Sequence, residues 1–126
     1  MDEMNLRNYA YLGDAVWELF VREITVLKTQ NAKELHKITS ETVNAKSQHD
    51  FLLKIQDILT EEELEILRRA RNLPVPVARK SNQSDYRMAT AFEALIGWWY
   101  KNNQERLEEI KKILLEVFTK KNQQIK

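Results

Sequence analysis

Residues 88–100 read MATAFEALIGWWY, and this is the stretch of the sequence that decides the fold class. Its 13 residues contain a single charge, Glu93. A membrane-spanning helix takes about 20 apolar residues, so this stretch is too short and too polar to cross a bilayer. With Ser84 as its N-cap, it predicts an apolar helix over residues 84–101 of a globular protein.

Helical spacing of apolar residues recurs on both sides of this stretch. Thr60 followed by Glu63 is a capping-box pattern that predicts a helix start. Residues 73–83 hold both prolines and form the one clear non-helical segment. The expected helices are residues 6–28, a short helix capped by Asn31, one from Thr39 or Ser40 to residue 59, 60–71, 84–101, and one from Gln104 or Glu105 with a frayed tail at 120–126. The sequence therefore predicts an all-α fold, a compact bundle of about six or seven helices in a single domain over residues 1–126.

The composition is typical of a globular protein. The chain has 126 residues, of which 43% are apolar and 31% charged, with only two glycines and two prolines. Scarce glycine and proline favour helices over a turn-rich sheet protein. The sequence has no cysteine, which excludes disulfides and thiolate metal sites. The N-terminus lacks the charged-then-apolar order of a signal peptide, so we expect a cytoplasmic protein.

The charge is uneven along the chain, although its formal net value is only +1. Residues 68–87 hold six basic side chains against one acid, Asp85. Such a segment can contact the phosphates of a nucleic acid, or it can be a solvated helix end and loop. Charge alone leaves both interpretations open.

Two acidic residues stand apart from the other charges. Asp14 is the only charge in residues 8–17, and Glu93 is the only charge in residues 88–100. A carboxylate in an apolar stretch costs several kcal/mol unless it is paired or binds a cation. If the two helices pack together, both carboxylates can converge on one hard cation with oxygen ligands, which suits Mg²⁺.

These acids also have structural interpretations. Asp14 can be an N-cap where one helical piece ends and another begins, next to Gly13, which marks a bend or a close contact. Glu93 can form a buried ion pair with an arginine, such as Arg87 or Arg71. Glu18 lies one turn after Asp14, and is either a further acid of the site or the partner of a basic residue.

Other catalytic signals are missing. His36 and His49 stand alone in the sequence, without an acid at the spacing of a triad or a zinc site, so we expect surface or packing histidines. Gly13 and Gly97 are too far apart for a phosphate-binding glycine loop. Any chemistry therefore depends on the carboxylates.

Two motifs resemble those of a known family. The run YLGDAV at residues 11–16 is similar to the signature of the ribonuclease III catalytic domain, and AFEALIG at residues 91–97 resembles the family's second acidic motif. RRARN at residues 68–72 and YRMAT at residues 86–90 resemble the Mini-ribonuclease III subgroup, whose catalytic domain stands alone without a double-stranded-RNA-binding domain. The resemblance runs from about Asn8 to about Val117.

This resemblance implies a ribonuclease III catalytic-domain-like homodimer that hydrolyses double-stranded RNA with a divalent metal, leaving 5′-phosphate and 3′-hydroxyl ends. It implies Asp14 and Glu93 as the catalytic, Mg²⁺-binding residues and Tyr11 as an aromatic residue of the dimer interface. For the subgroup it implies maturation of large-subunit (23S) ribosomal RNA precursors. Larger members carry two further acids, and Ala10 and Thr90 stand at those positions, so we expect more water around the metal.

The same chemistry suggests where RNA would bind. A carboxylate-bound Mg²⁺ can activate water and stabilise the leaving oxygen without a histidine. Duplex RNA is recognised by shape, through phosphates and 2′-hydroxyls, and the candidates for these contacts are Arg71, Arg79, Lys80 and Arg87. A non-catalytic helical module that binds RNA or a protein through the same basic segment is the alternative, and a purely structural oligomer is a third class.

Overall fold

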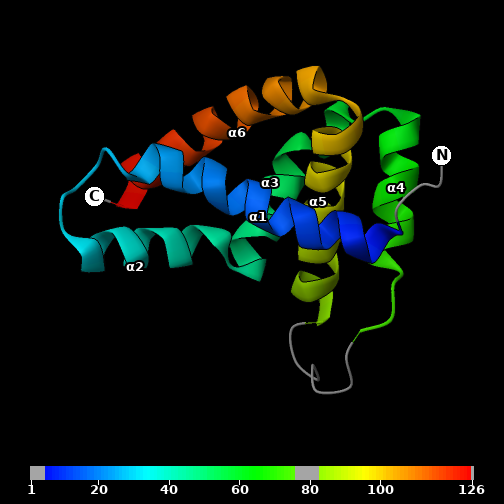
Figure 1. Ribbon diagram of the computed structural model, residues 1–126, viewed down its shortest axis with the longest axis horizontal. Helices are drawn as coiled ribbons and strands as arrows, with labels where there is room; N and C mark the ends of the chain where they lie inside the picture. Colours follow the sequence, from blue (N-terminus) through cyan, green and yellow to red (C-terminus); the bar gives the residue numbers. More distant parts are fainter. Residues whose placement is uncertain (1–4, 76–82, 126) are drawn as a thin grey trace.

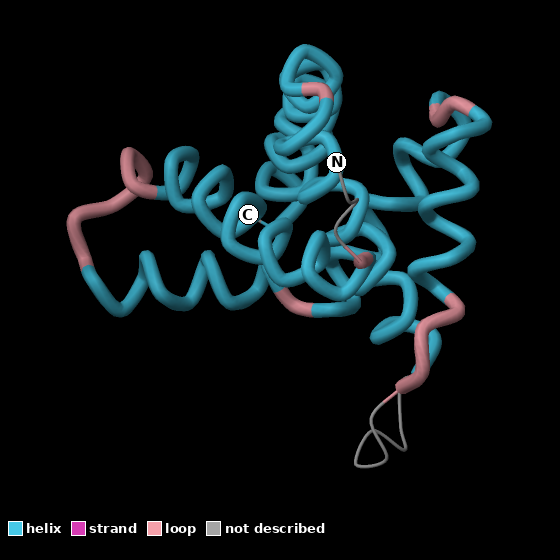
Figure 2. The backbone as a smooth tube through the Cα atoms, turned by 45° about the vertical axis from the view of Figure 1, so that its right-hand side comes forward, coloured by secondary structure: helices cyan, strands magenta, loops and turns pink. Residues whose placement is uncertain are grey.

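The computed structural model describes residues 5–75 and 83–125. Within these ranges the chain forms six α-helices and one short 3₁₀ helix, without a strand (Figures 1 and 2). The elements are α1 (Leu6–Thr25), α2 (Ala32–Val43), α3 (Ala45–Ile55), η1 (Gln56–Ile58), α4 (Glu61–Arg71), α5 (Gln83–Asn102) and α6 (Gln104–Ile125). The all-α prediction is confirmed. None of the described helices has an apolar run long enough to span a bilayer.

The expected boundary between α2 and α3 is wrong. The helix that begins at Ala32 does not give way to a new one at Thr39 or Ser40 but continues to Val43. Asn44 makes the break, because its side-chain oxygen accepts a hydrogen bond from the N–H of Ser47 and its amide nitrogen donates to the carbonyl oxygen of Ser40. One asparagine thus satisfies backbone groups at the end of α2 and at the start of α3.

Two other helix ends also differ from expectation. α5 begins at Gln83, so Ser84 lies inside the helix instead of capping it. α6 continues to Ile125, where the sequence predicted a frayed tail from residue 120. The capping box is confirmed: the Thr60 hydroxyl accepts from the N–H of Glu63, and the Glu63 carboxylate accepts from the N–H of Thr60.

The most extensive helix contact joins α1 and α5, which cross steeply at the centre of the molecule (Figure 1). A Cβ added to Gly13 would lie 1.7 Å from the carbonyl oxygen of Glu93, and one added to Gly97 would lie 1.9 Å from that of Tyr9. Both distances are far inside van der Waals contact, so only glycine lets these two backbones meet. The close contact expected at Gly13 is therefore present.

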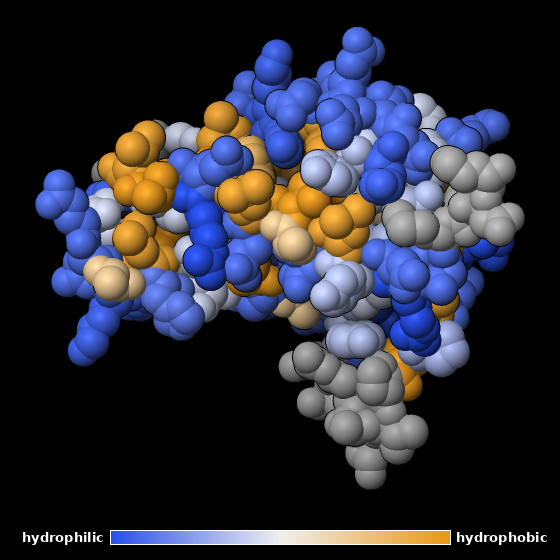
Figure 3. All heavy atoms as spheres, viewed as in Figure 1, coloured by the Kyte–Doolittle hydropathy of each residue, from blue (hydrophilic) through white to orange (hydrophobic). Residues whose placement is uncertain are grey.

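Helix α1 carries apolar residues on both of its faces. One face packs into the core, whereas Tyr11 is 85% exposed, Leu19 60% and Val26 56% on the other. Hydrophobic atoms gather along α1 on the face shown in Figure 3. Scattered exposed apolar residues are common on monomeric proteins, but several of them grouped along one helix are typical of a contact surface.

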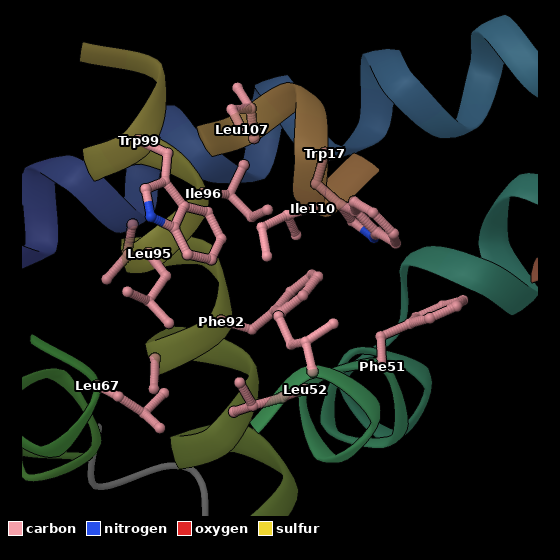
Figure 4. Packing of buried hydrophobic residues seen from close by; sticks show 14 of the residues in the cluster. Trp17, Phe51, Leu52, Leu67, Phe92, Leu95, Ile96, Trp99, Leu107 and Ile110 are labelled. Carbon is pink, nitrogen blue, oxygen red and sulfur yellow. The ribbon is translucent and has the colours of Figure 1, made fainter. Parts of the chain in front are cut away.

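The core lies where α1, α3, α5 and α6 meet (Figure 4). The Trp17 ring packs against Phe20, Phe51 and Phe92, with ring centroids 5.0–5.3 Å apart. Tilted and edge-on aromatic pairs at this separation stabilise the fold beyond the burial of their area. This packing holds α1 and α3 on α5, the helix that carries Glu93.

A second buried carboxylate fastens α4 to the rest of the bundle. Glu63 accepts hydrogen bonds from Nε1 of Trp99 at 2.7 Å and from Nε and Nη2 of Arg106 at 2.9 Å each. Burial alone would raise the pKa of Glu63, but the bonds from Arg106, the Thr60 N–H and Trp99 together lower it. Every oxygen of this carboxylate is satisfied, so Glu63 has a structural role.

Candidate active site

The crossing of α1 and α5 brings Asp14 and Glu93 together. Asp14 follows Gly13 on α1 and is exposed, whereas Glu93 on α5 is half-buried. The Asp14 carboxyl lies close enough to the Glu93 carboxyl to raise the pKa of Glu93, through a hydrogen bond and through its negative charge. The two isolated acids of the sequence, 79 positions apart in the numbering, therefore form one pair in space.

The pair changes the acidity of Glu93. Burial, then a hydrogen bond with Asp14 and the negative charge of Asp14, together raise the pKa of Glu93 to about 8, and only the bond from Gln48 opposes this shift. Two adjacent carboxylates cannot both stay ionised cheaply without a positive charge. Near neutral pH, Glu93 therefore holds a proton. A bound cation would relieve the repulsion between the two carboxylates in the place of that proton.

The structural alternatives for the two acids do not hold. α1 is continuous from Leu6 to Thr25, so Asp14 lies in mid-helix and caps nothing. The Arg87 guanidinium does not pair with Glu93 but donates to the carbonyl oxygens of Arg71 and Leu73, both at 3.1 Å. Among the ion pairs within residues 5–75 and 83–125, none joins Glu93 to an arginine.

Gln48 belongs to the site, and sequence analysis missed it. It is 2% exposed in the first turn of α3, and its Nε2 donates to Oε2 of Glu93 at 3.4 Å. An uncharged amide in an amphipathic helix looks like any polar surface residue, so the sequence carries no signal for this role. The amide holds one oxygen of Glu93 on the side of α3.

His49, next to Gln48, is not isolated as expected. Its Nδ1 lies 2.8 Å from Oδ1 of Asp85, near the start of α5. The two residues are 36 positions apart, a separation that concealed the pair in the sequence. The contact ties the start of α5 to α3, the helix that carries Gln48. His36, in contrast, is exposed on α2.

The remaining positions considered for the metal site contribute no carboxylate to it. Ala10 is buried, and the Thr90 hydroxyl donates to the carbonyl oxygen of Tyr86 at 2.9 Å. Glu18 forms an ion pair with Arg22 at 2.9 Å, the alternative expected for it. The described part of the chain contains no group of three or more histidine, cysteine or acidic side chains able to hold a metal. Of the acids considered for the metal site, only Asp14 and Glu93 thus lie together in the described part of the chain.

The basic candidates differ in their surroundings. Arg71 is exposed at the end of α4, whereas Arg87 is half-buried and directed at backbone carbonyls. Arg79 and Lys80 lie outside the described residues.

The sequence is similar to those of known proteins. The sequence matches the ribonuclease III domain over residues 7–104. It is 39% identical to a Mini-ribonuclease 3 of Clostridium tetani over 127 residues, covering 98% of this chain and 84% of that one. A Mini-ribonuclease 3 of Gloeobacter violaceus is 41% identical over 104 residues, covering 82% of this chain and 77% of the relative.

A solved structure shows the same fold. The crystal structure of a protein from Fusobacterium nucleatum superposes with a TM-score of 0.79 at 34% identity, covering 90% of this chain and 93% of that one. The chain belongs to the ribonuclease III family. It is accordingly an endoribonuclease, a hydrolase, and the non-catalytic alternatives are set aside.

Proposed function

We propose that this endoribonuclease hydrolyses double-stranded RNA with Mg²⁺, leaving 5′-phosphate and 3′-hydroxyl ends, with Asp14 and Glu93 as the metal-binding residues. The observation that carries the proposal is that the α1–α5 crossing brings these two carboxyls together, where burial and Asp14 raise the pKa of Glu93 to about 8. A cation that replaces the shared proton would stabilise both carboxylates at once.

The donor set fits a hard cation. Mg²⁺ prefers oxygen ligands, is bound by one or two carboxylates, and keeps several waters. When bound, it makes a water nucleophilic near neutral pH and stabilises the leaving 3′-oxygen. Asp14 is exposed and so accessible to a phosphate, whereas Glu93 is held from behind by Gln48. The chain thus offers one ligand on the substrate side and one anchored in the bundle.

Membership of the ribonuclease III family and the basic side chains support duplex RNA as the substrate. Arg71 is exposed at the end of α4, and we assign Arg71, Arg79 and Lys80 to phosphate contacts. Arg87 supports this region by bonding the carbonyl oxygens of Arg71 and Leu73. A large-subunit (23S) ribosomal RNA precursor in the cytoplasm is the natural substrate we propose.

We further propose that the enzyme acts as a homodimer through the exposed apolar side chains of α1, Tyr11 and Leu19. Tyr11, at 85% exposure, projects from this helix, and a hollow of about 270 Å³ opens between α1 and α2 beside Val26, Ala32 and Leu35. A two-fold dimer would supply one carboxylate pair for each RNA strand. Tyr11→Asp should shift the protein toward monomer in sedimentation, and an unchanged dimer would place the interface elsewhere.

The deciding experiment is cleavage of a defined RNA duplex with and without Mg²⁺. We expect cuts only with metal, only in the duplex, and with 5′ ends that can be ligated without prior phosphorylation. The single-stranded form of the same RNA and the Asp14→Asn variant are the controls. Equal cleavage of single-stranded RNA would overturn the substrate, and full activity in a chelator would overturn the metal.

A further inference from the structure

The arginines in the described residues fall into two sets. Arg22, Arg68 and Arg106 form ion pairs with acidic side chains. No described carboxylate forms such a pair with the members of the second set, which are Arg7, Arg69, Arg71 and Arg87. Three of these four, all except Arg69, line a single hollow together with Leu73, Pro74 and Thr90. Positive charge without a carboxylate partner is therefore concentrated at one place.

The same arginines fix the backbone beside this hollow. Nη2 of Arg7 donates to the carbonyl oxygen of Pro74 at 2.9 Å, and Nη1 of Arg87 donates to those of Arg71 and Leu73. A guanidinium has five N–H donors, and a neutral carbonyl does not cancel its charge. Arg7 remains exposed, so its charge is accessible to an anion from outside.

The hollow adjoins the carboxylate pair. Thr90, on its wall, lies three residues before Glu93 on α5, about one helical turn. Arg7 lies seven residues before Asp14 on α1, a rise of about 10 Å. The space inside is about 10 Å³, enough for one water or one phosphate oxygen and too small for a base. An anion would therefore bind at its mouth through its oxygens.

We propose that Arg7 and Arg71 form a phosphate-binding site for the duplex RNA strand that passes the carboxylate pair, with Arg87 as the positioning residue behind it. The inference rests on the proposed function, because it takes the anion to be a backbone phosphate of the duplex substrate. The planar guanidinium fork matches phosphate oxygens. Arg7 shares α1 with Asp14, Arg87 shares α5 with Glu93, and Arg71 ends α4.

The test compares Arg7→Ala with Arg69→Ala, which removes the same charge from an exposed α4 position that does not line the hollow. Binding of an RNA duplex is measured without Mg²⁺ over a range of salt. Arg7→Ala should raise Kd about fivefold near 0.1 M salt and flatten the slope of log K against log salt by about one unit. Arg69→Ala should leave both near wild type. At saturating RNA with Mg²⁺, kcat of the control Arg69→Ala should also be unchanged.

The outcomes separate charge from structure. Arg7→Lys should restore the salt slope and part of the affinity, because it keeps the charge but loses the fork. A loss that Arg7→Lys does not reduce would show that the bond to Pro74 matters and would overturn the phosphate contact. An equal loss in Arg69→Ala, or no loss in Arg7→Ala, would also overturn it.

The same data distinguish this inference from the proposed function. Specific binding through Arg7 without any cleavage by the wild type would remove the proposed function and keep the phosphate site. Cleavage by the wild type, together with equal RNA affinity and salt dependence in Arg7→Ala and Arg69→Ala, would keep the proposed function and remove the phosphate site. If the wild type does not bind duplex RNA at all, both fail.

Discussion

Glu63 and Glu93 are the same residue type in the same helical bundle, yet their surroundings shift their pKa values in opposite directions. Glu63 is 3% exposed and accepts hydrogen bonds from Arg106, Trp99 and the Thr60 N–H, which hold its pKa below the ordinary value. Burial and the neighbouring Asp14 raise the pKa of Glu93 to about 8. Glu63 has a positive partner within the protein, whereas no described basic side chain forms an ion pair with Glu93.

The difference shows how a structural carboxylate can be told from a functional one. Both residues are withdrawn from water, so burial alone does not separate them. What separates them is the partner: Arg106 neutralises Glu63, whereas Asp14 adds a second negative charge to Glu93. A perturbed acid next to a like charge is a candidate functional site for this reason.

The largest expected effect is the loss of RNA cleavage when Glu93 or Asp14 loses its negative charge. Glu93→Gln and Asp14→Asn should each lower the cleavage rate about a thousandfold, about 4 kcal/mol of transition-state stabilisation. Circular dichroism and duplex binding should stay close to wild type, because neither acid holds the fold together. Cleavage at wild-type rates in either variant would remove these residues from the metal site.

The same substitution at Glu63 should have the opposite result, a loss of stability without a loss of cleavage. Glu63→Gln removes the charge that neutralises Arg106 and should lower the free energy of unfolding by about 3 kcal/mol, measured in urea. The folded fraction should still cleave RNA normally. Glu65→Gln is the control, since the Glu65–Arg68 pair on the same helix is exposed and should matter little. A Glu63→Gln variant as stable as Glu65→Gln would contradict the structural role.

The two glutamates should also give opposite dependences of stability on pH. For Glu93, whose folded-state pKa is raised from 4.5 to about 8, the folded state holds the proton more tightly than the unfolded state between these values. Its contribution is fully present below 4.5 and is lost as the pH rises through about 8. For Glu63, whose pKa is lowered, the contribution is present above 4.5 and is lost as the pH falls below it.

Metal-free protein should therefore lose about 2 kcal/mol between about pH 5 and pH 8.5 relative to Glu93→Gln, after allowance for solvent screening. Thermal unfolding of both proteins across this range measures the difference. Added Mg²⁺ should reverse the loss in the wild type alone, because metal binding displaces the proton. Parallel pH profiles for the two proteins would contradict the raised pKa of Glu93.

The smallest expected effect is on Mg²⁺ affinity, when Glu93 loses the hydrogen bond from the uncharged side chain of Gln48. Gln48→Leu keeps the bulk but removes the hydrogen bond, and should raise the Mg²⁺ concentration for half-maximal activity about tenfold. Calorimetric titration of the metal without RNA should show the same weakening. Gln56→Leu, an exposed amide just past the end of α3, is the matched control. Equal metal affinity in the two variants would mean that Gln48 only fills space.

Much of this site was predictable from residue patterns, although for partly incorrect reasons. Isolation from other charges selected Asp14 and Glu93, and the argument assumed that both were buried. Only Glu93 is withdrawn from water. Asp14 lies on the outer face of α1 with Tyr11 and Ala15, which are apolar or aromatic yet exposed, so the surrounding sequence misrepresented its environment.

The rest depends on contacts between distant segments. Gln48 reaches Glu93 across 45 positions, His49 reaches Asp85 across 36, and Arg7 reaches Pro74 across 67. None of these pairs has a spacing that helical periodicity can reveal. The helix break at Asn44 was readable, because asparagine is a preferred N-cap, but Thr39 and Ser40 offered competing caps a turn earlier.

The close crossing at Gly13 and Gly97 has a consequence for how this site can change. Because the two main chains touch there, the separation of the positions that carry Asp14 and Glu93 is set by the backbone. An acid can be lost or regained at positions 10 and 90 without displacing the two that remain. Moving this carboxylate pair into another helical bundle would require glycine at both crossing positions as well, because the absence of a side chain at Gly13 and Gly97 sets the distance between the two helices.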